Sequence, residues 1–227
     1  MFVEISGFLF LLIIVVLVTA TSRYGYEIFS ELDSDAKLQE ISEDPKKFRT
    51  GTMLVVFEHV VIITLAVTMF IAFSPFNLIL GIVWVCARGG EGLIQIYNKR
   101  NYWGLLNIAT QYSEASGTEK DALADSALTI LKSKNSTFSF AQILFSIGTL
   151  AYSIVFVIYG VLDIFGFIGW FGIVAGMIYG LGNGVTRVRP NAKALWNLGG
   201  LLIWIFELVL GVWLLFPPSR PAPIPAL

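Results

Sequence analysis

Long apolar stretches separated by polar segments dominate the pattern of this chain. Six stretches are long enough to cross the hydrocarbon core of a bilayer, which takes about 20 helical residues. We expect membrane-spanning helices at Phe2–Ala20, Thr52–Phe73, Leu78–Tyr97, Phe138–Tyr159, Ile164–Gly184 and Leu195–Phe216. The pattern therefore predicts an all-α fold, a polytopic membrane helix bundle with six transmembrane helices that fills residues 1–216.

The segments between these helices differ in length and character. The two longest, 21–51 and 98–137, are expected to be loops with partial structure, because both retain apolar residues. In the second, Leu123, Ala127 and Ile130 recur at helical spacing, which predicts a short amphipathic helix. The last segment, 217–227, contains five prolines, which predicts an extended, disordered tail.

The basic residues predict the orientation in the membrane. Thirteen of the 15 lysines and arginines fall in the three connections after the first, third and fifth helices. Because cytoplasmic loops carry an excess of Lys and Arg, these connections should face the cytoplasm. Both termini should then lie on the non-cytoplasmic side.

Composition narrows the function classes further. Only 14% of residues are charged, whereas a soluble domain carries roughly 25%. The net charge of -1 gives no basic excess, so no nucleic-acid partner is expected. One cysteine, Cys86, and one histidine, His59, exclude an intrachain disulfide, a Cys/His zinc finger and bis-histidine haem ligation within this chain. We therefore expect no cofactor.

Several polar residues lie inside the predicted helices, where ionisable groups are costly and usually pair with one another. At about 1.5 Å rise per residue, Arg88 and Glu207 fall near the midplane. A second level nearer the cytoplasm contains Glu58, His59, Glu91 and Gln142. Arg88 and Glu91 are three residues apart, so they can also pair along one helix face. We expect these six residues to form an intramembrane polar cluster.

One arginine cannot neutralise three buried glutamates, so a bound proton, a protonated His59 or a bound cation must balance the charge. Three interpretations stay open at this point. The cluster fixes how the helices associate, it binds a small solute, proton or ion, or it is a metal or catalytic site. A metal site is the weakest of these patterns, because only one histidine is present and its acidic neighbour, Glu58, points about 100° away on a helix.

Glycines recur every four residues in the predicted fifth helix, at Gly172, Gly176, Gly180 and Gly184. Such a stripe lets another helix backbone approach closely in lipid. It predicts either packing within the bundle or a contact with a second copy of the chain.

Several short motifs carry a family resemblance. They are Phe48-Arg49-x-Gly51 before the second apolar stretch, Arg88-x-x-Glu91 in the third, and Leu198-Gly199-Gly200 followed by Glu207-Leu208 and Gly211-x-Trp213-Leu214 in the last. With this order of elements, the chain resembles the prokaryotic membrane proteins of domain of unknown function family four-three-eight-six. The resemblance covers about Phe2 to Phe216 and implies a multi-pass protein of a prokaryotic cytoplasmic membrane. It implies no activity.

Two functions are compatible with these patterns. The first is an integral membrane protein, not expected to be an enzyme, whose polar cluster binds a small ligand or relays protons or ions. In it Glu91 and Glu58 titrate, Arg88 is the fixed counter-charge and His59 is a relay. The alternative is a structural or accessory subunit of a larger membrane complex, with the lipid bilayer and other membrane subunits as partners.

Overall fold

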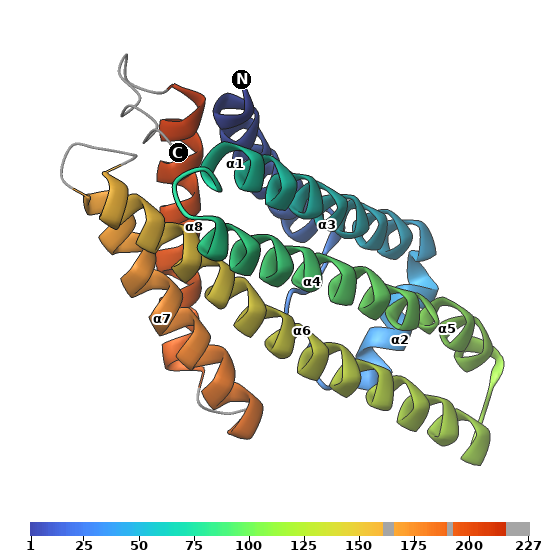
Figure 1. Cartoon of the computed structure of the whole chain (residues 1–227). Coiled ribbons are helices and arrows are strands. Elements are labelled where there is room, and N and C mark those ends of the chain that lie inside the picture. The colour runs from blue at the N-terminus through green and yellow to red at the C-terminus, as the bar shows by residue number, and fades with distance from the viewer. Residues whose placement is uncertain (161–165, 190–192, 217–227) are drawn as a thin grey trace. The chain divides into compact units, whose positions relative to one another are not determined.

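The computed structural model describes residues 1–160, 166–189 and 193–216, and all regular structure in these ranges is helical. Figure 1 shows the helices in chain order. Their bounds are α1 Phe2–Tyr24, α2 Ser34–Glu43, α3 Pro45–Phe73, α4 Leu78–Trp103, α5 Leu105–Glu114, α6 Thr118–Tyr159, α7 Phe167–Val188 and α8 Ala194–Leu215. Within the described ranges, six candidate spans are long and apolar enough to cross a membrane, which confirms an all-helical fold of the membrane class.

The long connections contain more helix than expected. Helix α3 begins at Pro45 rather than at Thr52, because Asp44 caps it and proline suits a first helical position. The Asp44 carboxylate accepts a hydrogen bond from the Lys47 backbone N–H at 2.9 Å. Helix α6 begins at Thr118 rather than at Phe138, so the amphipathic turn expected as a separate short helix is the first half of a long one. No glycine or proline interrupts residues 118–147, so nothing in the chain ends that helix early.

Two predicted features lie partly outside the described residues. The expected start of the fifth spanning helix at Ile164 falls in the range 161–165, and the proline-rich tail falls in 217–227.

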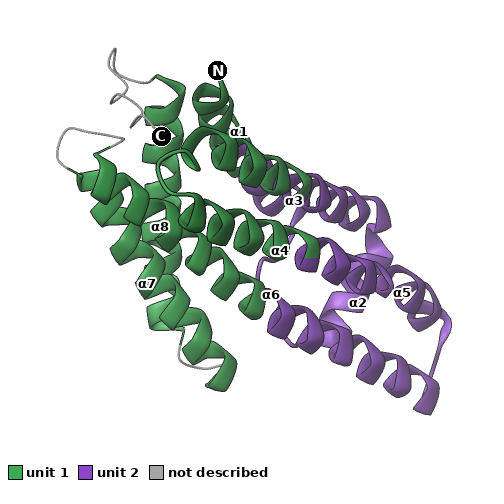
Figure 2. Cartoon of the chain, in the orientation of Figure 1, with its two compact units in different colours: residues 1–14, 60–93, 139–227 green, residues 15–59, 94–138 purple. Residues whose placement is uncertain are grey.

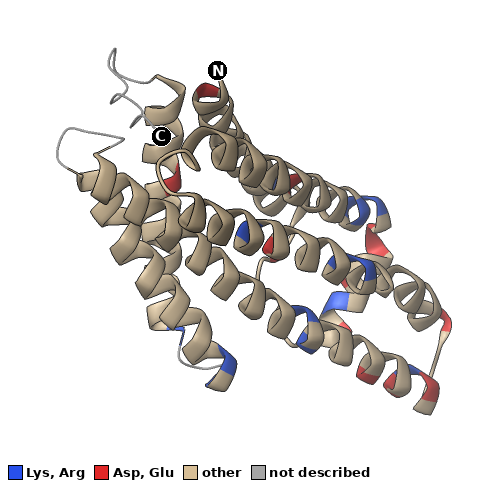
Figure 3. Cartoon of the chain, viewed as in Figure 1, with Lys and Arg blue, Asp and Glu red and all other residues tan. Residues whose placement is uncertain are grey.

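The helices form two compact units, shown in different colours in Figure 2. Unit 1 contains residues 1–14, 60–93 and 139–227, and unit 2 contains residues 15–59 and 94–138. Helices α1, α3, α4 and α6 each contribute residues to both units, whereas α7 and α8 belong to unit 1, and α2 and α5 to unit 2. Most charged residues are in unit 2, and few are in unit 1 (Figure 3).

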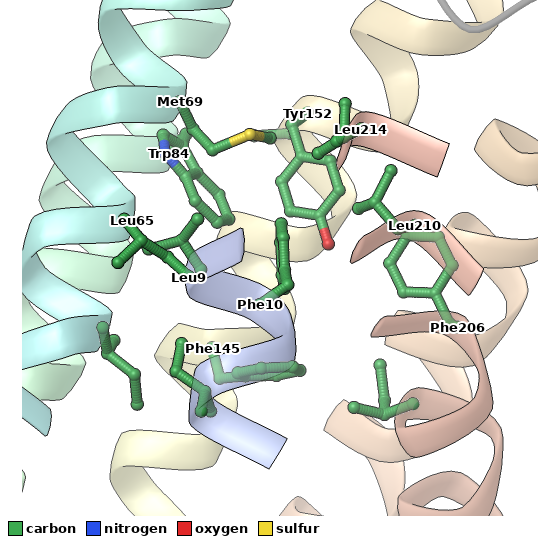
Figure 4. Close-up of a cluster of buried hydrophobic side chains, with 14 of the residues drawn as sticks. Leu9, Phe10, Leu65, Met69, Trp84, Phe145, Tyr152, Phe206, Leu210 and Leu214 are labelled. Carbon is green, nitrogen blue, oxygen red and sulfur yellow. The ribbon is translucent and has the colours of Figure 1, made fainter. Parts of the chain in front are cut away.

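Aromatic side chains form the core of unit 1. The ring of Tyr152 from α6 lies edge-on to Trp84 of α4 at 4.5 Å and stacks on Phe206 of α8 at 6.0 Å. Figure 4 shows these rings with aliphatic side chains of α1, α3 and α8 around them. In lipid the surroundings are as apolar as the core, so van der Waals packing rather than the hydrophobic effect holds such helices together. Trp84 Nε1 also donates a hydrogen bond to the Ala66 carbonyl of α3 at 2.9 Å.

A turn after α1 and a short strap organise unit 2. Gly25 adopts a left-handed conformation with φ 64°, and the Tyr26 N–H donates to the Ala20 carbonyl, which closes the end of α1. The strap, residues 25–33, then leads to α2, whose first turn is capped by Asp33. The strap is fixed to α6, because the Asn135 side chain exchanges two hydrogen bonds with the Ser30 main chain at 2.8 and 2.7 Å.

Candidate functional site

The strongest charge constellation in unit 1 joins helices α4 and α8. Arg88 and Glu91 lie on one face of α4, and Arg88 Nη1 donates to Glu91 Oε2 at 2.6 Å. Arg88 Nη2 lies 3.6 Å from Oε1 of Glu207 on α8. All three residues are buried, with residue exposures of 1%, 2% and 9% for Arg88, Glu91 and Glu207. The structure thus brings together three of the six residues of the predicted polar cluster, here named the Arg88 triad.

Aromatic rings and a glycine position the guanidinium group of Arg88. Its Cζ lies 4.3 Å from the centre of the Phe145 ring and 5.5 Å from that of Trp84, both within cation–π range. Gly148 on α6 leaves room for the arginine stem, since a Cβ there would lie 2.9 Å from Arg88 Cγ. The guanidinium is therefore held between α4, α6 and α8 by packing as well as by charge.

The charges of the Arg88 triad do not cancel. Two carboxyl groups face one guanidinium. Tyr179 of α7 lies within electrostatic range of all three members, and its hydroxyl is neutral at physiological pH. With both carboxylates ionised, the triad has a net charge of one negative.

The remaining predicted cluster residues divide between the two units. Gln142 is buried on α6 in unit 1, where its main-chain carbonyl accepts a hydrogen bond from Ser146 Oγ. Glu58 and His59 are buried on α3 in unit 2. His59 Nδ1 lies 2.6 Å from the Val55 carbonyl and 3.0 Å from Glu58 Oε2. Because a carbonyl can only accept, this nitrogen carries the hydrogen of the Val55 contact.

Unit 2 contains buried cations that the sequence analysis treated only as markers of topology: Lys37, Lys99 and Lys134. Lys134 donates to the Glu27 carbonyl at 2.6 Å and to Ser30 Oγ at 2.7 Å, which fixes the strap on α6. Lys99 donates to Gln95 Oε1 at 3.3 Å. Both ammonium groups lie over the ring of Tyr26, at 5.1 and 5.5 Å.

Lys37 has acidic partners, unlike the other two. Its ammonium group donates to Glu27 at 2.9 Å and to Glu40 at 2.7 Å. Burial acts to lower the pKa of Lys37, but attraction to Tyr102 and the bonds to Glu40 and Glu27 outweigh it, so this pKa is raised.

A sequence signal for Lys99 exists along α4. Its buried polar residues recur at helical spacing: Arg88, Glu91, Gln95, Asn98, Lys99 and Tyr102. This stripe continues past Tyr97, where the sequence pattern predicted the helix to end. Lys99 and Tyr102 were therefore not recognised as part of the same helix face.

The glycines of α7 meet neighbours within unit 1. A Cβ on Gly172 would clash with Ser153 of α6 and Phe206 of α8, and those on Gly176 and Gly180 would lie 3.4 and 3.0 Å from side chains of α6. A Cβ on Gly184 would meet nothing within 4 Å. Packing inside the unit therefore accounts for three of these glycines, and a contact with a second copy stays a prediction.

Metal ligation has no support in the part of the chain that the structure describes, where no three His, Cys, Asp or Glu side chains come together as ligands. Cys86 is exposed and free.

Six candidate spans and a buried charge constellation define a helical membrane protein of the multi-pass class. Residues 5–217 match the family described as Domain of unknown function (DUF4386), and the chain belongs to that family. No curated protein and no solved structure matches the chain.

Proposed function

We propose that this protein is an integral membrane protein that binds and releases a proton at the Arg88 triad. One observation carries the proposal, namely that two buried carboxyl groups share one guanidinium. A net charge in a low-dielectric interior is costly, so the cluster takes up a compensating proton. Perturbed carboxyl groups inside a membrane bundle commonly belong to proton or ion pathways.

The geometry favours Glu207 as the group that carries the proton. Its oxygen lies 3.6 Å from the guanidinium, whereas that of Glu91 lies at a hydrogen-bond distance of 2.6 Å. The closer contact stabilises the ionised form of Glu91 more strongly. Glu207 is also the more exposed of the two, at 9% against 2%, which eases proton exchange. The proposal thereby moves the titrating role from Glu91 and Glu58 to Glu207.

The cellular setting belongs to the same proposal. The basic connections support a cytoplasmic membrane with the strap and α2 on the cytoplasmic side.

Infrared spectroscopy of the purified chain tests the protonated carboxyl directly. At neutral pH the wild type should show the carbonyl stretching band of a protonated carboxylic acid, shifted in heavy water. Glu207→Gln should remove this band. Glu4→Gln should retain it, because Glu4 pairs with the terminal amine at the start of α1. A wild type without the band contradicts the proposal.

Proton movement is tested in sealed vesicles that contain the protein and a pH-sensitive dye. Under an imposed membrane potential, wild type and Glu4→Gln should change the internal pH equally, and Glu207→Gln should match empty vesicles. Equal rates for Glu207→Gln and wild type would remove proton transfer from the triad.

A further inference from the structure

Among its described residues, unit 2 has more buried amine groups than buried carboxyl groups. Its buried ammonium groups belong to Lys37, Lys99 and Lys134, and its one buried carboxylate among the described residues is that of Glu58. Lys37 is balanced by Glu27 and Glu40. Lys99 and Lys134 then share one buried carboxyl group among the described residues of unit 2, that of Glu58.

Neither of these two ammonium groups forms an ion pair in the described part of unit 2. No carboxylate oxygen lies within 4.0 Å of Lys99 or Lys134 in the ranges that the structure describes. Lys134 bonds to neutral oxygens only, and Glu58 reaches Lys99 by longer-range attraction. Buried charges are normally paired, because an unpaired charge in a low-dielectric interior is costly.

Unused hydrogen-bond donors lie beside Lys99. Its ammonium group has three donors, and its one hydrogen bond to a described residue goes to Gln95 Oε1 at 3.3 Å. The amide nitrogen of that same Gln95 is fully buried and has no hydrogen-bond partner among the described residues. Lys99 is 2% exposed and Gln95 0%, so bulk water does not satisfy these donors. Two neighbouring side chains on one face of α4 thus present donors to an acceptor that none of the described residues supplies.

We propose that Lys99 and Gln95 bind a small anion, a phosphate or carboxylate group, inside unit 2. The anion accepts from the Lys99 ammonium and from the Gln95 amide, and so satisfies donors that are otherwise left buried. The carboxylate of Glu58, which would repel an anion, is held beside the Nδ1–H of His59 and attracted by Lys99. The anion is either a free small molecule or the headgroup of an acidic lipid. This site does not depend on the proton site of the Arg88 triad.

Thermal unfolding and calorimetry with inorganic phosphate test the free anion. The full chain in neutral detergent is exchanged into gluconate and then titrated with phosphate at constant ionic strength. We expect saturable stabilisation of the wild type, with affinity at least roughly tenfold weaker in Lys99→Gln, since a charge-assisted hydrogen bond is lost. Lys132→Gln is the matched control, because Lys132 is exposed on α6, and it should behave as the wild type.

Nanodiscs distinguish the lipid source. A lipid headgroup is identified as the anion if phosphatidic acid stabilises the wild type more than phosphatidylcholine does. This difference should be lost in Lys99→Gln and kept in Lys132→Gln. Lys99→Met keeps the side-chain length without a charge. It should lose the same stabilisation as Lys99→Gln, by phosphate or by phosphatidic acid, whichever of the two stabilises the wild type. The proposal is overturned if neither phosphate nor phosphatidic acid stabilises the wild type, or if the Lys99 variants respond as the wild type does.

Discussion

At the scale of single residues, the two units differ in which buried ionisable groups they bring together. Arg88 is set against two carboxyl groups in unit 1, and Lys99 and Lys134 are set against one in unit 2. Depth arithmetic from the sequence predicted an Arg88–Glu207 pair. It could not show that Glu58 has a lysine for an electrostatic partner, because Lys99 was assigned to a loop.

Removal of the guanidinium tests the Arg88 triad at this scale. Arg88→Ala removes the guanidinium that faces Glu91 and Glu207 and leaves a cavity beside Phe145. We expect the free energy of unfolding to fall by roughly 3–5 kcal/mol, as for other broken buried ion pairs. Denaturant unfolding in mixed micelles measures it. The triple variant Arg88→Ala, Glu91→Gln, Glu207→Gln should regain part of the lost stability. An unchanged stability of Arg88→Ala alone would show that the ion pairs of Arg88 do not contribute to stability.

At the scale of elements, the structure adds the true helix boundaries and the places where two helices approach each other closely. Caps such as Asp44 and the absence of breakers in 118–147 lengthen α3 and α6 toward the charged segments. Hydropathy marks only the apolar part of a helix, so it ends each predicted helix where the lipid ends. That is why the polar stripe of α4 was divided at Tyr97.

The packing of α7 on α6 gives a prediction for this scale. Gly172→Ala places a methyl group against Ser153 and Phe206, and overpacking of this kind costs roughly 1–3 kcal/mol. Gly184→Ala meets open space and should be neutral or stabilising by up to about 1 kcal/mol through helix propensity. Thermal unfolding of both variants in the same detergent provides the comparison. Equal stability of the two would mean that α7 does not approach α6 closely.

For the whole molecule, orientation and partners are the open properties, and both are testable in cells. In a Cys86→Ser background, a membrane-impermeant maleimide should label Pro75→Cys in intact cells, because the turn between α3 and α4 is predicted to lie outside. Ser116→Cys, between α5 and α6, should react only after permeabilisation. The reverse pattern would invert the topology. Isolation of the protein from gently solubilised membranes of the same strain tests the alternative of an accessory subunit. That alternative requires the protein to co-purify constantly with a larger assembly.

The sequence by itself determined the number of spans, the helical class and the family, because these depend on the length and composition of continuous segments. It also supplied the members of the Arg88 triad, since few ionisable residues occur in apolar segments. Only the tertiary structure decided which donors and charges are left without partners. That property depends on distances between side chains far apart in the chain, as between Lys134 and the strap, and spacing along one helix does not contain them.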